Sequence, residues 1–512
     1  MEGHSSSKEQ TGGTGNESTK GDQCTYIFCR AAHTAALNDY LLVVRVTIDM
    51  LPDVALLRVF DLYMDEDQIE AWQMLVHVCR EWRDLVFGSP RRLDLRLLCT
   101  DSTTVREMLD VWPLLPIVVR AKRLRSSKLD NVIAALEQSN RICQLELYLP
   151  LQSSDQEQIL AAMQRPFPAL TNLQLHWFFR GHQIIWVDPE SFLGGFAPNL
   201  RTLVLDSIQF PVSPKLLLSA THLVDLHLRR NFLSPEDMLP AFSALTRLKK
   251  LNIESSSNTV RKSLRPPQPT RTLLPVLTKF QFKGFDEYLE DLVARVDAPL
   301  LDHLDITFLD KPTSDYPQLI QLISRTPKFK AQDRARVVFD DYDVWVTLSQ
   351  TFNGRLSLRL SDNSSDWQLW SLAPVCKTSF PRSLILAVEY LYLFGPSLEC
   401  VRYNPWGNRE WLKIFHPFAA VKSLYISYSF APTIAYSLEE LIGERVGEVL
   451  PALETLFIEE SYLLEKEIKE AIGRFIAARQ LAGRTIAVCR WEDVKDVWKD
   501  EFGDTYPYLD CF

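Results

Sequence analysis

The sequence of 512 residues has no uninterrupted apolar run of the roughly 18 residues that a membrane-spanning helix requires. Its most apolar early segment, Leu41 to Val46, is short and contains Arg45. The residues before this segment lack the charged start and the small-residue cleavage pattern of a secretion signal. We therefore expect a protein that neither spans a membrane nor carries a secretion signal.

Cysteine pairs and an excess of positive charge are missing as well. The nine cysteines occur singly, without a C-x-x-C pair or the dense spacing of small secreted domains, so we expect a reducing compartment, the cytoplasm and/or the nucleus. The formal net charge of −9 argues against nucleic acid as a partner, because nucleic-acid binding depends on neutralising phosphates with Lys and Arg. Most of the excess lies between Glu439 and Asp510, with 17 acidic and 9 basic residues. A solvated surface explains it, and an electrostatic docking surface is the alternative.

The motifs of common enzymes are also missing. The sequence contains no G-x-S-x-G elbow, no protein-kinase set, no H-E-x-x-H pair and no glycine-rich dinucleotide turn. His176, His222, His227 and His303 lie in or beside expected strands with no second ligand at metal spacing, so we interpret them as surface or packing residues. We therefore predict no catalytic residue, no metal site and no cofactor, and we expect that the protein is not an enzyme.

The first informative segment spans residues 51–86. Residues 1–23 are rich in Ser, Thr, Gly and charge, so we expect a mostly disordered N-terminal tail over residues 1–48. Leu51-Pro52-Asp53 then suits the start of a helix, with a proline at an early position and an acidic residue at the positive end of the helix dipole. After an acidic run at Asp65, Glu66 and Asp67, steps of three and four residues predict one apolar helical stripe made of Trp72, Leu75, Cys79, Trp82 and Val86.

This segment resembles the F-box, the short helical module that docks onto the Skp adaptor of cullin-based ubiquitin ligases. The resemblance depends on Leu51-Pro52, Leu56-Leu57, Phe60 and the run from Val78 to Arg83. With its continuation at residues 89–95 and 112–117, the chain is similar to long F-box and repeat proteins of mushroom-type fungi. The resemblance implies that the apolar surface for the adaptor is formed or supported by Leu51, Pro52, Leu56, Leu57, Phe60, Val78, Cys79 and Trp82. The alternative for Trp82 is packing inside the module, and a buried packing thiol is expected for Cys79.

A repeated pattern follows the helical segment. An apolar residue, two others, an apolar residue, one other and an apolar residue recur ten times, first as Ile142, Leu145 and Leu147 and last as Leu453, Leu456 and Ile458. Up to Leu301 the repeats begin 23 to 30 residues apart. This period is typical of leucine-rich repeats, in which each strand is followed by a helix or turn and neighbouring repeats share a core.

The array is irregular. The repeat after Leu301 begins 87 residues later, at Val388. The β-rich runs between them, at 335–339, 343–348 and 355–360, miss the repeat template, so we expect a distorted middle there. Helix starts are indicated by Ser234-Pro235-Glu236, by Asp286, and by a capping box from Ser437 to Glu440. A helix over residues 465–480 that ends at Gly483, with a strand over 485–489, is expected to close the array.

The predicted fold is α/β, with an F-box over residues 49–90 and an irregular leucine-rich-repeat-like solenoid with a curved parallel sheet over residues 91–512. The apolar strand positions should point into the core, so the residues between them should line the opposite face of the sheet, which becomes the candidate target-binding surface. The residues chosen on this basis are Gln174, His176, Asp206, His227, Arg229, Lys250, Asn252, Gln281, Asp305, Tyr425 and Phe457.

These features predict a substrate receptor of a Skp-cullin-F-box ubiquitin ligase. Its expected partners are a Skp-type adaptor with its cullin and an unknown protein substrate, with neither nucleic acid nor a membrane involved. The alternative is a leucine-rich-repeat scaffold that takes part in protein interactions without a ligase. A hydrolase whose catalytic residues are dispersed in the sequence is a more distant third interpretation.

Overall fold

The structure is a computed structural model with two compact units, residues 1–93 and 94–512, and each unit is described by itself. The first unit ends close to the boundary expected after residue 90. The N-terminal tail expected over residues 1–48 lies outside the described residues. The structure describes residues 51–65, 71–88, 95–100, 103–112, 114–122, 129–149, 153–177, 185–230, 233–255, 271–309, 315–330, 332–339, 343–350, 354–361, 374, 376, 378–395, 408–441, 443–459 and 466–491.

The described part of the first unit contains three short helices, α2 (Asp53–Asp65), α3 (Ala71–Val78) and α4 (Arg80–Gly88). The carbonyl of Pro52 accepts hydrogen bonds from the amides of Ala55 and Leu56 at 2.8 and 3.1 Å, so α2 starts where the sequence predicts. The apolar side chains between the helices form a small core of Leu56, Phe60, Leu75, Val76 and Val86.

The predicted continuous stripe from Trp72 to Val86 is wrong in one respect, because the helix breaks at Cys79. The Cys79 thiol accepts a hydrogen bond from the backbone amide of Trp82 at 3.4 Å, and the Cys79 carbonyl accepts one from the amide of Arg83 at 3.2 Å. Cys79 therefore caps α4, which explains why a second helix begins there. The side chain of Trp72 is not among those described.

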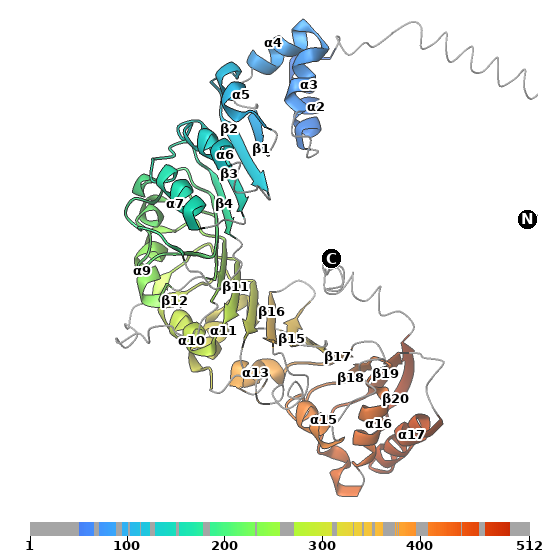
Figure 1. Ribbon diagram of the computed structural model, residues 1–512. Coiled ribbons are helices and arrows are strands. Elements are labelled where there is room, and N and C mark those ends of the chain that lie inside the picture. Colours follow the sequence, from blue (N-terminus) through green and yellow to red (C-terminus); the bar gives the residue numbers. More distant parts are fainter. Residues whose placement is uncertain are drawn as a thin grey trace, which may run out of the picture. The chain divides into compact units, whose positions relative to one another are not determined.

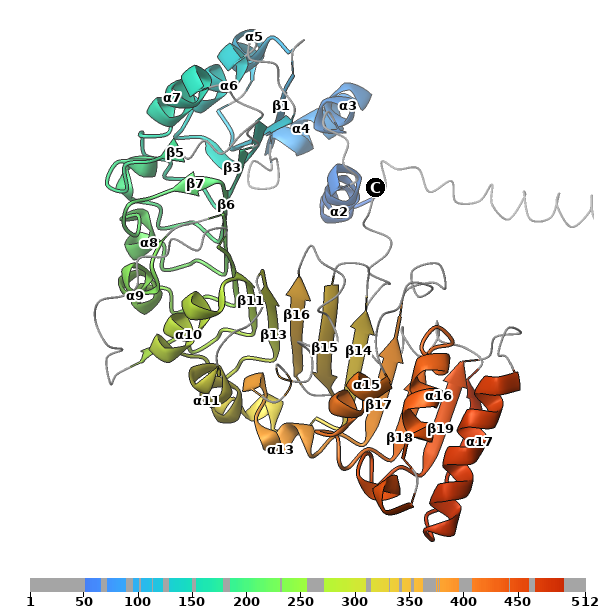
Figure 2. The same cartoon turned by 60° about the horizontal axis from the view of Figure 1, so that its bottom comes forward.

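In the second unit, the described residues form one mostly parallel sheet of 16 strands (Figures 1 and 2). In sheet order the strands are β1 (Leu95–Cys99), β2 (Ile117–Lys122), β3 (Ile142–Leu149), β4 (Asn172–Trp177), β6 (Thr202–Asp206), β8 (Asp225–Arg229), β9 (Lys250–Glu254), β11 (Lys279–Gly284), β13 (His303–Phe308), β16 (Arg355–Ser361), β15 (Asp343–Ser349), β14 (Arg334–Phe339), β17 (Tyr390–Phe394), β18 (Ser423–Ile426), β19 (Thr455–Glu459) and β20 (Ala487–Trp491). Two short parallel pairs lie beside it, β5 (Ile185–Trp186) with β7 (Ile208–Gln209) and β10 (Thr272–Leu273) with β12 (Val296–Asp297).

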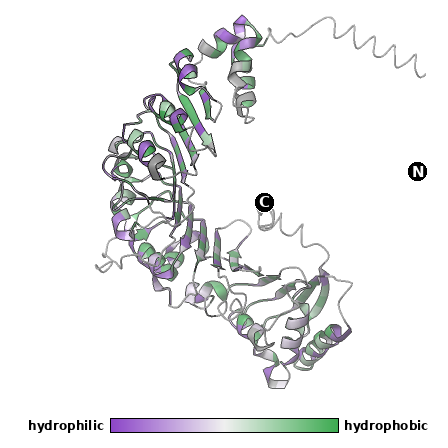
Figure 3. Cartoon of the chain, in the orientation of Figure 1, coloured by the Kyte–Doolittle hydropathy of each residue, from purple (hydrophilic) through white to green (hydrophobic). Residues whose placement is uncertain are grey.

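The helices of this unit cover one face of the sheet (Figures 1 and 2). They carry both hydrophobic and hydrophilic residues (Figure 3), as expected for helices with one buried side. None of the described helices combines the length and the apolar composition that crossing a membrane requires. The helices are α5 (Val105–Val111), α6 (Leu129–Leu136), α7 (Ser153–Ala162), η3 (Phe192–Gly195), α8 (Leu216–Ser219), α9 (Pro235–Ala244), α10 (Asp286–Arg295), α11 (Pro317–Arg325), η4 (Pro327–Phe329), α13 (Arg382–Ile385), α15 (Asn408–Phe415), α16 (Ala431–Glu439), η6 (Gly443–Gly447) and α17 (Lys466–Leu481).

Each of the ten repeated segments of the sequence contains a strand, and the apolar positions of these strands lie in register. Leu145, Leu173, Leu203, Leu226 and Leu251 are paired across five successive strands, and each is at most 2% exposed. The repeated leucines therefore form a continuous row in the core beneath the helices. Burying such a row stabilises each repeat only in the presence of its neighbours.

The middle of the sheet departs from an all-parallel arrangement, which corrects the predicted parallel sheet. The β-rich runs are strands, as their alternation suggests, but β15 pairs antiparallel with both β14 and β16. The connections between these three strands are short, and a short connection joins antiparallel strands, whereas a parallel pair needs a long crossover. The sheet therefore passes from β13 to β16, back through β15 to β14, and then to β17.

The predicted helix boundaries had mixed outcomes. Ser234 caps α9 by accepting a hydrogen bond from the amide of Asp237 at 3.1 Å, and α17 ends before Gly483, which has a φ of +75°. The predicted capping box at Ser437 is wrong, because Ser437 lies near the C-terminal end of α16 and its hydroxyl donates to the carbonyl of Thr433. A proline in the first turn starts that helix instead.

Candidate functional site

The face of the 16-stranded sheet that the described helices leave uncovered is here called the open face (Figures 1 and 2). Burial alternates along its strands. On β8, Leu226 and Leu228 are at most 2% exposed, whereas Asp225, His227 and Arg229 are half-buried. Because successive side chains of a strand point to opposite faces, the polar residues of β8 lie on the open face.

The same alternation places all the predicted target-binding residues on the open face. One register row runs across β4 to β13 through Gln174, His227, Asn252, Gln281 and Asp305. The neighbouring row contains His176, Asp206 and Arg229. Tyr425 and Phe457 lie apart from these rows, on β18 and β19, so the structure divides the predicted surface into two regions.

We call the first region, on β3 to β13, the polar region. Its side chains bind one another along the rows: the Asn252 amide donates to Oε1 of Gln281 at 3.5 Å, and the Gln281 amide donates to Oδ2 of Asp305 at 3.3 Å. In an outer row, Lys283 Nζ lies 3.0 Å from Glu254 Oε1. These neighbours fix the positions of the polar groups and leave part of each exposed to a partner.

The most deeply buried polar group of this region is Asp206, which is 5% exposed. Nε and Nη2 of Arg230 donate to Asp206 Oδ1 at 2.9 and 2.7 Å, and Nδ1 of His176 lies 3.6 Å from Oδ2. The His176 ring also stacks on Tyr148 at 4.2 Å between centroids. Burial alone would raise the pKa of Asp206, but the hydrogen bonds to His176 and Arg230 outweigh it, so the pKa lies below the usual value for aspartate.

Asp225 forms a similar arrangement on β8. Oδ1 of Asp225 lies 2.7 Å from Nε2 of His227, and Nζ of Lys250 lies 3.8 Å from Oδ2. Burial raises the pKa of Asp225, but the His227 hydrogen bond and the nearby positive charges lower it further than burial raises it. Within the described part of the chain, no three His, Cys, Asp or Glu side chains form a metal-binding group. The histidines of this face are thus oriented by carboxylates as hydrogen-bonding groups.

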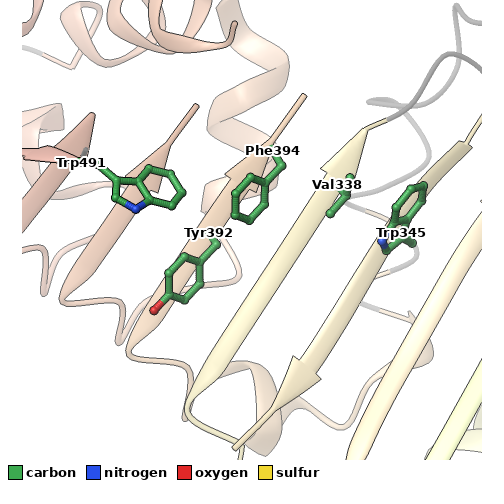
Figure 4. Close-up of a cluster of buried hydrophobic side chains, with 5 residues drawn as sticks. All are labelled: Val338, Trp345, Tyr392, Phe394 and Trp491. Carbon is green, nitrogen blue, oxygen red and sulfur yellow. The ribbon is translucent and has the colours of Figure 1, made fainter. Parts of the chain in front are cut away.

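The second region contains aromatic residues and arginines on β14 to β20, and we call it the arginine–aromatic patch. Its buried members lie on the same side of the sheet, four of them on the adjacent strands β15, β14 and β17 and Trp491 on β20 (Figure 4). They are Val338, Trp345, Tyr392, Phe394 and Trp491, with Tyr390, Tyr425 and Phe457 packed against them. Four arginines on β14 and β16 belong to the same face, namely Arg334, Arg336, Arg355 and Arg359.

The patch is built by stacking in register. Tyr392, Tyr425 and Phe457 lie side by side on β17, β18 and β19, with ring centroids 4.3 Å apart in both pairs and interplanar angles of 14° and 3°. The guanidinium of Arg336 lies 5.5 Å from the centroid of the Phe394 ring, and that of Arg359 lies 5.2 Å from the Trp345 ring. Such cation–π contacts combine apolar surface with positive charge.

The sequence analysis found only Tyr425 and Phe457 of this patch. A period of two was nevertheless visible in Tyr390, Tyr392 and Phe394, and in Arg334 with Arg336. The repeat template draws attention to the leucines, which are the inward residues, and β14 to β16 do not match the template. A search for aromatic residues or arginines at every second position would have found the patch.

The predicted adaptor-binding residues of the first unit divide into internal and external groups. Phe60 is 2% exposed, and its ring centroid lies 4.7 Å from that of Trp82, so these two rings pack against each other, with Phe60 in the core and Trp82 half-buried. Leu56 is buried, Leu51, Leu57 and Cys79 are half-buried, and Pro52 and Val78 are exposed. The unit also exposes large apolar residues that the resemblance did not assign, and these are Val54, Val59, Leu62 and Met74.

A pocket of 780 Å³ lies near α15 and η6. Lys413, His416, Arg445 and Glu448 contribute to its lining. Nε of Arg445 lies 2.8 Å from Oε2 of Glu448, so two of these charges neutralise each other. We assign no reaction to this pocket.

Comparison with models of known protein families gives no match to this sequence, and comparison with curated proteins gives none either. The functional interpretation therefore depends on the residues and on the two surfaces described above. These are the exposed apolar side chains of the helical unit and the open face of the sheet.

Proposed function

We propose that this chain is the substrate-recognition subunit of a Skp-cullin-F-box type ubiquitin ligase. In this proposal the helical unit binds the Skp adaptor, the open face binds a target protein, and other subunits carry out ubiquitin transfer. The chain itself is then not an enzyme and needs no cofactor, and it acts in the cytoplasm and/or the nucleus, where its partners are present.

The main support is the arrangement of apolar residues on α2 and α3. The rings of Phe60 and Trp82 pack against each other with centroids 4.7 Å apart, and Phe60 belongs to the core of the unit. Outside that interior, Val54 is 72% exposed, Leu62 55%, Met74 61% and Val78 59%. Large apolar side chains left exposed this densely in a small helical unit indicate a surface that another protein covers.

The open face supports the second half of the proposal. Strands β4 to β13 present polar side chains held by their neighbours. On β18 and β19, Tyr425 and Phe457 are half-buried beside the buried aromatic residues of the patch. Surfaces with positioned hydrogen-bonding groups and aromatic or arginine anchors are typical of protein interfaces. In this fold the repeated leucines lie beneath helices on one side of the sheet, and none of the described helices covers the open face (Figures 1 and 2).

A second candidate is an interaction scaffold in which the helical unit is only a packing module. The observation that favours it is the position of Trp82, because the most characteristic residue of the F-box resemblance packs against Phe60. Both candidate functions use the open face to bind a target, but only the ligase subunit binds the adaptor.

Size-exclusion chromatography of the full chain with a purified Skp-type adaptor separates them. The ligase proposal predicts a stable one-to-one complex, and addition of the cullin should extend it. The scaffold predicts separate elution at all concentrations, and that result would remove the ligase proposal.

A further inference from the structure

The arginine–aromatic patch is buried although it lies on the face without described helices. Tyr392 is 2% exposed, Trp491 5%, Phe394 6% and Trp345 9%. In the polar region of the same face, by contrast, residues such as Asn252 and His227 are half-buried and Lys250 is exposed. The apolar side chains of the patch therefore do not form a free surface, and a further segment must cover them.

The position of Trp491 indicates which segment covers the patch. It is the last residue of β20, three strands from β17, which corresponds to roughly 14 Å at the usual strand spacing. Yet its ring centroid lies 5.3 Å from Tyr425 and 5.5 Å from Phe394. The Trp491 side chain thus leans across the open face toward β17, and the chain continues from this point into residues 492–512.

The charges of the patch and of residues 492–512 are complementary. On β14 to β20 the open face carries four arginines and two acidic residues, a net charge of +2. Asp343 pairs with Arg359, and Glu459 accepts a hydrogen bond from the amide of Tyr428. Residues 492–512 contain seven acidic residues, two lysines and five aromatic residues, which gives a net charge of −5. Segments 362–373 and 396–407, which follow β16 and β17 in the chain, have net charges of −2 and 0 by the same count.

The length of the segment is also sufficient. Six strand spacings separate β20 from β16, or about 29 Å. An extended chain spans about 3.3 Å per residue, so roughly nine residues cover this distance, whereas 21 residues follow Trp491. The acidic side chains could therefore reach every arginine of the patch.

We propose that residues 492–512 bind across the arginine–aromatic patch of the same chain, with their carboxylates on the arginines and their aromatic side chains against the stacked rings. Arginine binds carboxylates in a planar, two-pronged geometry and also packs on aromatic faces, so one acidic and aromatic segment satisfies both features of the patch. This contact leaves the polar region as the part of the open face available to a partner. The proposal does not depend on the ligase assignment.

Site-specific photo-crosslinking in the full chain tests this proposal. The variant Phe457→p-benzoylphenylalanine places a crosslinker in the stack beside Tyr425, and a matched variant at Asn252 places one in the polar region of the same face. After irradiation and digestion, mass spectrometry should find crosslinks from position 457 to peptides within residues 492–512, and none to those peptides from position 252. Replacing the seven acidic residues of the segment with their amides should lower the crosslink yield at position 457 at least about fivefold, because the charge attraction is lost.

The crosslink yield at raised salt concentration, measured with the acidic residues of the segment unchanged, provides a second readout. It does not require the amide variant to fold. Screening should reduce the yield between 0.1 and 1 M salt, where the Debye length falls from about 10 to 3 Å. Crosslinks from position 457 to segments 362–373 or 396–407, to a second copy of the chain, or to no peptide at all would overturn the proposal. A yield that is unchanged in the amide variant and at high salt would overturn it as well.

Discussion

At the scale of single residues, the C-terminal helix is fixed by a buried arginine. Arg479 on α17 is fully buried, and its Nη2 donates to the carbonyls of Val449 and Leu450 at 2.6 and 3.1 Å. Leu450 has a φ of +48°, so the guanidinium stabilises a strained turn just before β19. Burial lowers the pKa of Arg479 because it removes water from the charged guanidinium. The two carbonyls replace part of that hydration.

The variant Arg479→Ala should therefore destabilise the second unit. Two hydrogen bonds to a charged donor are lost and two carbonyls remain without it, so we expect a decrease of roughly 2–3 kcal/mol in the free energy of unfolding, measured by urea denaturation. Arg474→Ala on the same helix is the matched control, because Arg474 forms an exposed ion pair with Glu439 and its loss should leave the midpoint unchanged. Equal effects of both variants would contradict this role of Arg479.

A second residue-scale prediction concerns Asp206 and pH. Because the pKa of Asp206 in the folded chain lies below its value in the unfolded chain, the stabilisation is complete above about pH 4 and is lost as the pH falls through the folded-state value. Asp206→Asn should lower the free energy of unfolding by roughly 1–3 kcal/mol at pH 7, since Arg230 loses its partner.

The measurement is denaturation of wild type and Asp206→Asn from pH 7 down to pH 3. The difference between the two proteins should shrink at the acidic end. Arg230→Gln should show the same loss, and combining both substitutions should cost less than their sum. A difference that is constant over this range would show that the carboxylate charge contributes nothing.

At the scale of elements, the sequence predicted strands well and their directions less well. The leucines of β4 to β13 are recognisable because each lies at a buried position that recurs at a fixed spacing. In β14 to β16 the alternation identifies strands but is the same for parallel and antiparallel neighbours. The reversal of β15 is indicated instead by the short connections on both sides of it.

Helix ends were harder to predict because local motifs compete. Ser234 caps α9 as its sequence suggests, whereas the equally good motif at Ser437 lies inside α16, which starts earlier. The break at Cys79 depends on a thiol acting as a cap, a residue type that cap preferences do not include. The candidate site had a related limit. Alternation placed the polar residues correctly on the open face, and the stacked aromatic residues lie between the inward apolar positions of the last three repeats, where only Tyr425 and Phe457 were predicted.

The open face gives a prediction at this scale. Reversing two charges with Arg229→Glu and Lys250→Glu should abolish capture of the target, while the melting temperature changes little, because both side chains are at least partly exposed. Lys466→Glu with Lys469→Glu on α17, both exposed, provides a control of equal charge change. Proteins co-precipitated with each variant would be compared by mass spectrometry. Capture that survives charge reversal along the polar region would mean that the target binds elsewhere.

At the scale of the whole molecule, the chain combines a helical unit that exposes apolar residues with a large sheet whose open face has a partly exposed polar region and a buried arginine–aromatic patch. Neither unit brings together a metal-binding group within its described residues. Under the proposed function these two surfaces bind two partners, and the resemblance of residues 51–86 to an F-box indicates the adaptor as one of them. Adaptor binding is therefore the central claim.

The most direct test compares the adaptor affinity of the full chain with that of the double variant Leu51→Ala and Pro52→Ala by isothermal titration calorimetry. Pro52 is exposed, and its carbonyl, which accepts from the amides of Ala55 and Leu56, remains in the variant, so the melting curve should barely move. Phe60→Ala is the contrasting control, because it removes an internal ring and should unfold the helical unit. The account predicts submicromolar binding by the full chain and a loss of about thirtyfold or more, equivalent to about 2 kcal/mol, in the double variant. Unchanged affinity in the double variant, or no adaptor binding by the intact chain, would contradict it.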